Sequence, residues 1–257
     1  MARTLRLGRR GRRFKSCLPD HITKNMIHSI INYLSYLPII LLPILIILVF
    51  KYKKNIVRNK LILIVITLLS LLLLILIYSR FIEPNIINMQ STKIEVGFRG
   101  KIILISDVHV GAFSNSKFSR KIVERINAID NADVVILAGD ITYYPKDDLK
   151  ELLSPLKDIK YPVVAVLGNH DTGHPGPDIK DELVSSLTEL GIIYLENTTT
   201  IIDGIDTTFF GFGELWDKNV DVKAMETAKE NGNLIAIAHN PDTVYKYGET
   251  LPNLTLS

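Results

Sequence analysis

Four short apolar runs, each followed at once by a polar motif, constrain the fold of residues 92–257 more than any other feature. Nearly every side chain in these runs is aliphatic, as in strands that are buried on both faces of a parallel sheet. The runs are Ile102–Ile105, Val134–Leu137, Val163–Leu167 and Leu234–Ala238. Amphipathic segments separate them, and this alternation predicts an α/β layer fold.

The segments between these strands have helical patterns, and a β-rich stretch lies between the third and the fourth. The expected helices are Ser116–Ile129, Lys146–Asp158, Asp178–Leu190 and Val222–Glu230. The additional expected strands are Ile192–Leu195, Thr200–Ile202 and Thr207–Gly211, with a turn at Asp203-Gly204. Such a turn between apolar segments is typical of antiparallel pairing.

Polar motifs begin where the four strands should end. They are Asp107-Val108-His109, Gly139-Asp140, Gly168-Asn169-His170-Asp171 and Ala238-His239-Asn240. Ligands of open α/β sheets gather beyond the carboxyl ends of the strands, so residues far apart in the sequence can converge there. Each motif alone is common in turns, but four of them in this order after apolar strands indicate a functional site.

The side chains of these motifs form a mixed oxygen and nitrogen donor set. The expected metal ligands are Asp107, His109, Asp140, Asn169 and His239. In an extended chain Asp107 and His109 would point to the same face and could reach one ion. The two oxygens of Asp140 could bridge two ions. The set suits two divalent ions of Mn, Fe, Zn or Ni better than Ca.

Two such ions would activate a bridging water as hydroxide and hold the oxygens of a phosphoryl group. His170 is the expected catalytic histidine, acting as a general acid or as a donor to the transition state. Asp171, or a nearby carbonyl, is expected to fix the tautomer of His170. His174 lies in a loop rich in Pro and Gly, and we expect it to shape the entrance rather than bind metal.

From about Lys101 to Ser257 the motifs resemble those of the calcineurin-like metallophosphoesterase superfamily, whose pattern is D-x-H, G-D, G-N-H-D/E, a histidine and G-H-x-H. The resemblance implies an α/β/β/α sandwich. It implies that Asp107 and His109 bind the first metal, that Asp140 bridges, and that Asn169 and His239 bind the second. It also implies that His170 is catalytic.

Two segments are similar to a bacterial membrane-anchored, phosphodiesterase-like subgroup, Ser106–His109 and His239–Asp242. Some relatives there cleave the pyrophosphate of UDP-2,3-diacylglucosamine. We therefore expect a membrane-anchored phosphoester hydrolase of the phosphodiesterase or pyrophosphatase type. Its substrate would be a phosphoester or pyrophosphate, with lipid-linked compounds as candidates.

The sequence lacks the G-H-x-H motif that ends the family pattern. The sequence ends at Leu254–Ser257, where that motif is expected to begin, so we expect a C-terminally truncated domain. Such a fragment would be one histidine short on each metal and could be inactive alone. The alternative is a catalytically degenerate binding or sensory module on the same scaffold, bound to the membrane.

Two uncharged runs, 33–50 and 61–78, precede this domain. Eighteen apolar residues nearly cross a hydrocarbon core of about 30 Å. We expect a transmembrane helical hairpin over residues 33–82, followed by a linker at 83–91. A buried core helix is the alternative for the second run. A re-entrant or interfacial segment is the alternative for the first, which contains Pro38 and Pro43.

Charge is divided unevenly along the chain. Residues 1–60 hold 13 Lys and Arg and one acid, a net +12, so the remainder carries −9 of the total +3. The acidic remainder argues against binding of nucleic acid, and no protein partner is inferred. Five basic residues at 51–60 favour a cytoplasmic loop and an extracytoplasmic catalytic domain in the cell membrane. The basic N-terminal tail, 1–32, would then have to cross the membrane, unless it is a cytoplasmic arm.

Overall fold

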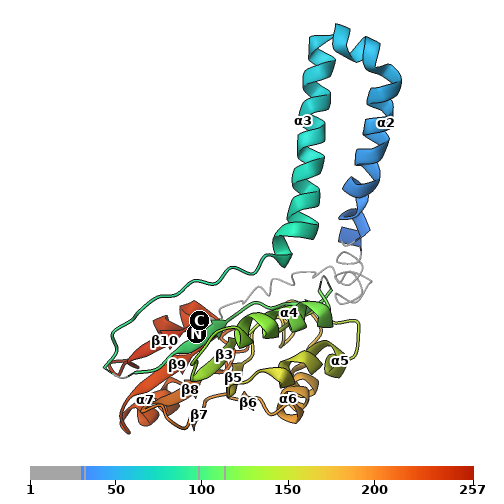
Figure 1. The fold of residues 1–257 in the computed structure, drawn as a ribbon. Helices are drawn as coiled ribbons and strands as arrows, with labels where there is room; N and C mark the ends of the chain where they lie inside the picture. The colour runs from blue at the N-terminus through green and yellow to red at the C-terminus, as the bar shows by residue number, and fades with distance from the viewer. Residues whose placement is uncertain (1–29, 32, 98, 113) are drawn as a thin grey trace, which may run out of the picture.

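The computed structural model describes residues 30–31, 33–97, 99–112 and 114–257. It consists of a long helical hairpin and an α/β domain joined by an extended segment (Figure 1). The basic tail predicted at 1–32 lies outside the described residues, apart from Ile30 and Ile31.

The hairpin consists of α2 (Leu37–Arg58) and α3 (Lys60–Ile77), with Asn59 between them. The side chain of Asn59 caps α3, because its Oδ1 accepts hydrogen bonds from the backbone N of Leu61 (3.0 Å) and Ile62 (3.3 Å). The expected loop at 51–60 is therefore wrong: residues 51–58 are the last turns of α2. The positive charges still gather at the tip of the hairpin.

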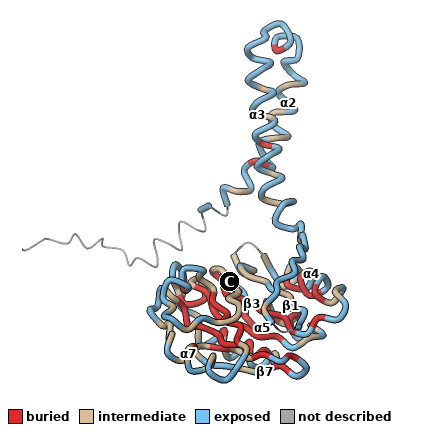
Figure 2. The backbone as a smooth tube through the Cα atoms, turned by 90° about the vertical axis from the view of Figure 1, so that its left-hand side faces the viewer, coloured by how far each residue is buried: buried red, intermediate tan, exposed pale blue. Residues whose placement is uncertain are grey.

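The hairpin exposes its apolar side chains. Figure 2 shows it mostly in the colour of exposed residues, in contrast to the buried strands of the domain. Among the described residues one helical segment, Lys60–Asn85, is long and apolar enough to cross a membrane, and only 6% of its apolar window is buried. This segment includes the run predicted at 61–78. The run predicted at 33–50 is helical from Leu37 onward but does not meet the same criterion.

A short π-helix (Tyr78–Ile82) and a 3₁₀ turn (Glu83–Asn85) follow α3, so the predicted linker begins within helical structure. Residues 86–95 that follow have no regular secondary structure, and the chain bends at 96–97. Lys121 Nζ donates a hydrogen bond to the carbonyl oxygen of Asn85, so the base of the hairpin touches the domain.

Two four-stranded sheets form the domain. The first, in the order β1-β3-β5-β6, is entirely parallel, and the second has the order β10-β9-β8-β7 with only β7 antiparallel to its neighbour. The strands are β1 (Ile102–Ile105), β3 (Val134–Ala138), β5 (Val163–Val166), β6 (Ile193–Tyr194), β7 (Thr198–Ile201), β8 (Thr208–Gly211), β9 (Leu234–Ile237) and β10 (Leu254–Leu256). Two short strands, β2 (Val110–Gly111) and β4 (Thr142–Tyr143), pair with each other nearby.

Three apolar layers hold these elements together. Successive residues of β3 show the division: Val135 and Leu137 face the helices, whereas Val134 and Ile136 face the second sheet. The third layer lies between the second sheet and α7. The helices are α4 (Ser116–Asn127), α5 (Leu149–Leu153), α6 (Lys180–Glu189) and α7 (Val222–Lys229). The layers are those of the expected sandwich.

One predicted helix is interrupted. The segment 146–158 forms the short helix α5 and then a 3₁₀ helix, η3 (Ser154–Asp158). Pro155 stands at the start of η3 and has no backbone N–H, so it cannot continue the α-helical hydrogen bonds.

Candidate metal centre

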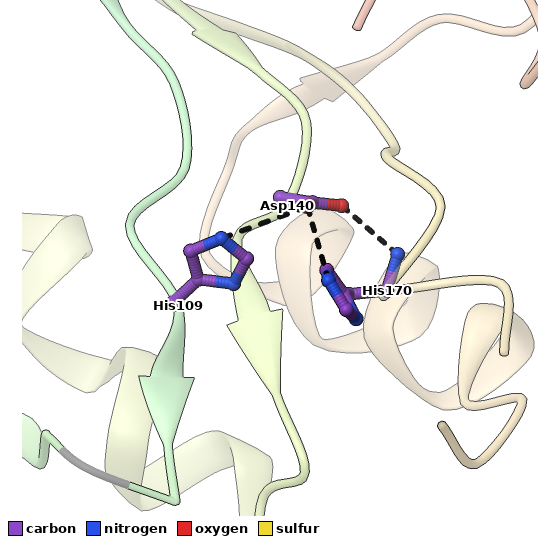
Figure 3. A group of neighbouring side chains, drawn as sticks. All are labelled: His109, Asp140 and His170. Carbon is purple, nitrogen blue, oxygen red and sulfur yellow. Dashed lines mark hydrogen bonds and ion pairs between the residues drawn. The ribbon is translucent and has the colours of Figure 1, made fainter. Parts of the chain in front are cut away.

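The strand ends of both sheets bring the predicted donors together around Asp140. Asp107 and His109 follow β1, Asp140 follows β3, and Asn169 and His170 follow β5. His239 arrives from the other sheet, where it follows β9. Figure 3 shows His109 and His170 approaching the carboxylate of Asp140 from two neighbouring loops.

Asp140 stands at the centre, with a side chain that is 4% exposed. Its Oδ1 lies 3.4 Å from His239 Nε2 and accepts a hydrogen bond from the backbone N of His170 (2.9 Å). Its Oδ2 lies 3.6 Å from His109 Nε2 and 3.8 Å from His170 Nε2. The two oxygens therefore face different sets of donors, as a bridging ligand requires.

Asp107 and His109 form one side of this arrangement. Asp107 Oδ1 lies 3.4 Å from His109 Nε2. The expected extended conformation is wrong, because the φ angles of Asp107 and His109 are 56° and 50°. Backbone hydrogen bonds from Asp107 to Gly139 (3.1 Å) and from His109 to Asp140 (3.0 Å) hold these left-handed residues beside the end of β3. Such strained residues concentrate at functional sites.

Asn169 and His239 form the other side. His239 Nδ1 lies 2.9 Å from the carbonyl oxygen of Ala138, which can only accept, so Nδ1 carries a hydrogen. In the neutral ring, Nε2 then keeps a free lone pair. Asn169 Nδ2 donates to the carbonyl oxygen of His174, which turns Oδ1 toward His239. Asn169 Oδ1 and His239 Nε2 lie 3.2 Å apart, both as acceptors.

The distances of 3.2–3.4 Å fit donors of a shared divalent cation, whereas Asp140 Oδ2 lies slightly farther from His109 and His170, at 3.6 and 3.8 Å. Donor atoms that share one ion at about 2.1 Å lie about 3.0–3.4 Å from each other. Acceptors at such distances repel one another unless a cation lies between them. Two groups of side chains could each hold an ion, and Asp140 belongs to both: Asp107, Asp140 and His239 in one, and His109, Asp140 and His170 in the other. The grouping differs from the predicted one: Asp107 lies with His239 rather than with His109, and His109 lies with His170.

The ring of His170 is fixed by a backbone carbonyl and by a neighbouring aromatic ring. Its Nδ1 lies 2.9 Å from the carbonyl oxygen of Pro175, so Nδ1 carries a hydrogen and Nε2 faces the site. The ring of Tyr143 packs edge-on against that of His170, with centroids 4.7 Å apart, and against that of His109 at 5.4 Å. Sequence reasoning missed Tyr143, although it lies three residues after Asp140, in β4.

Asp171 does not reach the site, and a catalytic role for it needs correction. Its buried carboxylate accepts hydrogen bonds from the backbone N of Gly168 (3.0 Å), Ile141 (3.1 Å) and Thr142 (2.9 Å), and from Thr142 Oγ1 (2.8 Å). Burial raises the pKa of this carboxyl, and the hydrogen bonds counter that rise. Asp171 therefore joins the loops after β3 and β5, and the carbonyl of Pro175 fixes the tautomer of His170.

Two glycines allow the strand ends to approach. A Cβ on Gly168 would lie 2.2 Å from Asp140 Oδ1 and 2.3 Å from the backbone N of Asp140. A Cβ on Gly139, whose φ is +83°, would lie 2.6 Å from His239 Cβ. Both positions require glycine because backbone and ligand lie in direct contact.

Comparison with known proteins agrees with this geometry. An uncharacterized metallophosphoesterase of Campylobacter jejuni is 27% identical over 61% of this chain and 42% of its own length. One of Helicobacter pylori is 28% identical over 58% and 41%, respectively. A zebrafish (Danio rerio) transmembrane protein with metallophosphoesterase domain is 26% identical over 61% and 38%.

The chain thus spans about two fifths of the length of these relatives. The family model for calcineurin-like phosphoesterases matches residues 100–254, which include every donor described above. The chain belongs to the calcineurin-like phosphoesterase family.

Proposed function

We propose that this domain is a dimetal phosphoester hydrolase of the phosphodiesterase or pyrophosphatase type. The observation that carries the proposal is the position of Asp140, whose two carboxylate oxygens face separate donor sets at 3.4 and 3.6 Å. A single-metal or purely structural site does not need a buried carboxylate turned to two histidines from different sheets.

Each residue of the site has a separate role in this proposal. Asp107 and His109, with donor atoms 3.4 Å apart, would hold one ion, and Asp140 would belong to both. Asn169 and His239, with donor atoms 3.2 Å apart, would hold the other ion, and Asp107 also lies within reach of His239. When bound, two divalent cations activate water as the nucleophile and neutralise charge on the phosphoryl oxygens. The neutral amide of Asn169 limits the negative charge that an incoming phosphate meets. With Nδ1–H donated to Pro175, His170 would donate a proton from Nε2 to the leaving oxygen in its imidazolium form, and the neutral ring would remain.

We also propose that the hairpin anchors the domain to the cell membrane and that the substrate is lipid-linked, with UDP-2,3-diacylglucosamine as one candidate. The exposed apolar surface of α2 and α3 supports the anchor. In both views the end of the chain lies on the side of the domain toward the hairpin. Because Ala238 donates to Leu256 at this edge (2.9 Å), His239 lies near the same side.

The charges at the hairpin tip support one orientation of the protein in the membrane. Lys51, Lys53, Lys54, Arg58 and Lys60 surround the turn at Asn59. Positive residues beside spans remain cytoplasmic, so the tip would be cytoplasmic and the domain extracytoplasmic. A protease that is added to intact cells should then cleave the domain but not the tip.

The activity is tested with bis-(p-nitrophenyl) phosphate and full-length protein, with Mn²⁺ or with a chelator. Asp140→Ala and His170→Ala should lose activity, whereas the surface change Asp206→Asn should not. Robust turnover by Asp140→Ala would refute the site. Metal binding without turnover on any phosphoester would favour the binding or sensory module. Parallel assays with UDP-2,3-diacylglucosamine test the substrate class.

A further inference from the structure

The dipeptide His174-Pro175 contacts two neighbouring site residues through its backbone. The carbonyl oxygen of His174 accepts a hydrogen bond from Asn169 Nδ2, and the backbone N of His174 donates to the carbonyl oxygen of Asn169 (2.7 Å). The carbonyl oxygen of Pro175 accepts from His170 Nδ1 (2.9 Å). The position of this dipeptide therefore decides where Asn169 Oδ1 and His170 Nε2 point.

The side chain of His174 is held by the other sheet. His174 Nε2 lies 2.7 Å from Asp217 Oδ1, and Asp217 belongs to the loop that follows β8. This contact therefore joins the loop after β5 to the loop after β8.

The loop that carries Asp217 is itself well fixed. The backbone N of Asn219 donates to the carbonyl oxygen of Glu214 (3.1 Å), and the backbone N of Gly213 donates to Asn197 Oδ1 (3.1 Å). Glu214 Oε1 accepts from the backbone N of Trp216 (3.1 Å). The carboxylate of Asp217 is thus held in place and can fix the position of His174.

We propose that Asp217, acting through His174, is a positioning residue that keeps the oxygen of Asn169 directed at the second metal position. Without Asp217 the imidazole of His174 loses its link to the loop after β8. The backbone carbonyl of His174, which orients the amide of Asn169, is then held less firmly. The inference rests on the proposed function, because it assigns Asn169 and His239 to one of two ions.

The expected effect is local. Both partners are partly exposed, with side chains 48% and 26% accessible, and such pairs contribute little to global stability. Partners that orient metal ligands matter far more for the metal, and their loss typically lowers affinity about 10–100-fold. Loss of Asp217 should therefore weaken one metal position and leave the fold intact.

The first measurement is a Mn²⁺ titration of the full-length protein by calorimetry. We expect Asp217→Asn and Asp217→Ala to weaken one of two binding events at least about tenfold and to leave the other within twofold of wild type. Asp217→Glu, which keeps the carboxylate, should restore part of the loss. The control is Glu189→Gln, which removes the carboxylate of a remote surface pair with Lys150 (2.8 Å).

The second measurement needs no metal. In chelator-treated protein, the NMR signal of the Asn169 side-chain amide should exchange faster with water in Asp217→Asn than in wild type or Glu189→Gln. If wild type neither binds Mn²⁺ nor turns over substrate but this amide still loosens, the proposed function fails and the positioning role stands. If wild type binds two ions and Asp217→Asn matches it in both measurements, the positioning role is overturned.

Discussion

The Nε2 atom of His239 lies 3.2 Å from the Oδ1 atom of Asn169, and in the neutral tautomer with the hydrogen on Nδ1 neither atom carries a hydrogen. The two residues are 70 positions apart and follow strands of different sheets. Two lone pairs that face each other are unfavourable unless a cation lies between them. The packing of the two sheets thus brings together acceptor atoms that suit a divalent cation, and several measurable consequences follow from the surroundings of this site.

Gly168→Ala should damage the site directly. The added Cβ would lie 2.2 Å from Asp140 Oδ1, so the central carboxylate must move. A misplacement of about 1 Å can cost about 10²-fold in rate, and we expect a loss of this size in phosphodiesterase assays. Gly100→Ala is the control, since its Cβ would meet its nearest neighbour at 3.6 Å. Equal activity of the two variants would contradict the close approach.

Asp171→Asn should destabilise the domain. Four donors surround the carboxylate, so an amide nitrogen in place of either oxygen leaves at least one buried backbone N–H without a partner. Such a group costs about 1–3 kcal/mol, which urea unfolding can detect. The exposed control Asp206→Asn should stay within about 0.5 kcal/mol of wild type. An unfolding midpoint for Asp171→Asn that matches the control would show that the carboxylate does not join the loops.

Glu214→Gln should change how stability depends on pH. Burial raises the pKa of Glu214 above its ordinary 4.5, while the hydrogen bond from the backbone N of Trp216 lowers it. The folded protein therefore holds this proton more tightly than the unfolded chain does. The contribution of Glu214 to the free energy of unfolding is therefore fully present below the pKa of the unfolded chain. It is lost as the pH rises through the higher pKa of the folded protein.

The neutral glutamine avoids this loss. With chelator present, the stability of Glu214→Gln relative to wild type should increase from pH 5 to pH 8, as measured by the midpoints of urea unfolding. An advantage that is the same at both ends of this range would show that Glu214 does not titrate there.

Charges in the middle of α3 should prevent stable membrane association. Each arginine at the centre of a span costs about 2.5–3.5 kcal/mol, so Leu68→Arg with Leu72→Arg costs about 5–7 kcal/mol. We expect this double variant to leave the carbonate-resistant membrane fraction. Tyr52→Arg with Val57→Arg, near the charged tip, introduces the same residues and should remain. If both double variants stay in the membrane fraction, α3 is not the anchor.

The sequence predicted the strands and most donors because buried parallel strands are continuous apolar runs and their ends carry the ligands. Asp107 and His109 show the limit: they converge through left-handed backbone conformations that depend on hydrogen bonds to Gly139 and Asp140. The contacts of Asp171 are not predictable from its own segment, because its partners Ile141 and Thr142 lie 30 and 29 residues away, beyond the end of β3. The contact of His174 with Asp217 depends on sheet packing, which no local pattern encodes.

The most direct test of the account is electron paramagnetic resonance of the full-length protein loaded with Mn²⁺. If Asp140 bridges two ions, wild type should bind two Mn²⁺ per chain and show the spectrum of an exchange-coupled pair. Asp140→Ala should lose that coupling, whereas Asp206→Asn should keep it. A wild-type spectrum of magnetically isolated Mn²⁺ at saturating metal would contradict the dimetal site.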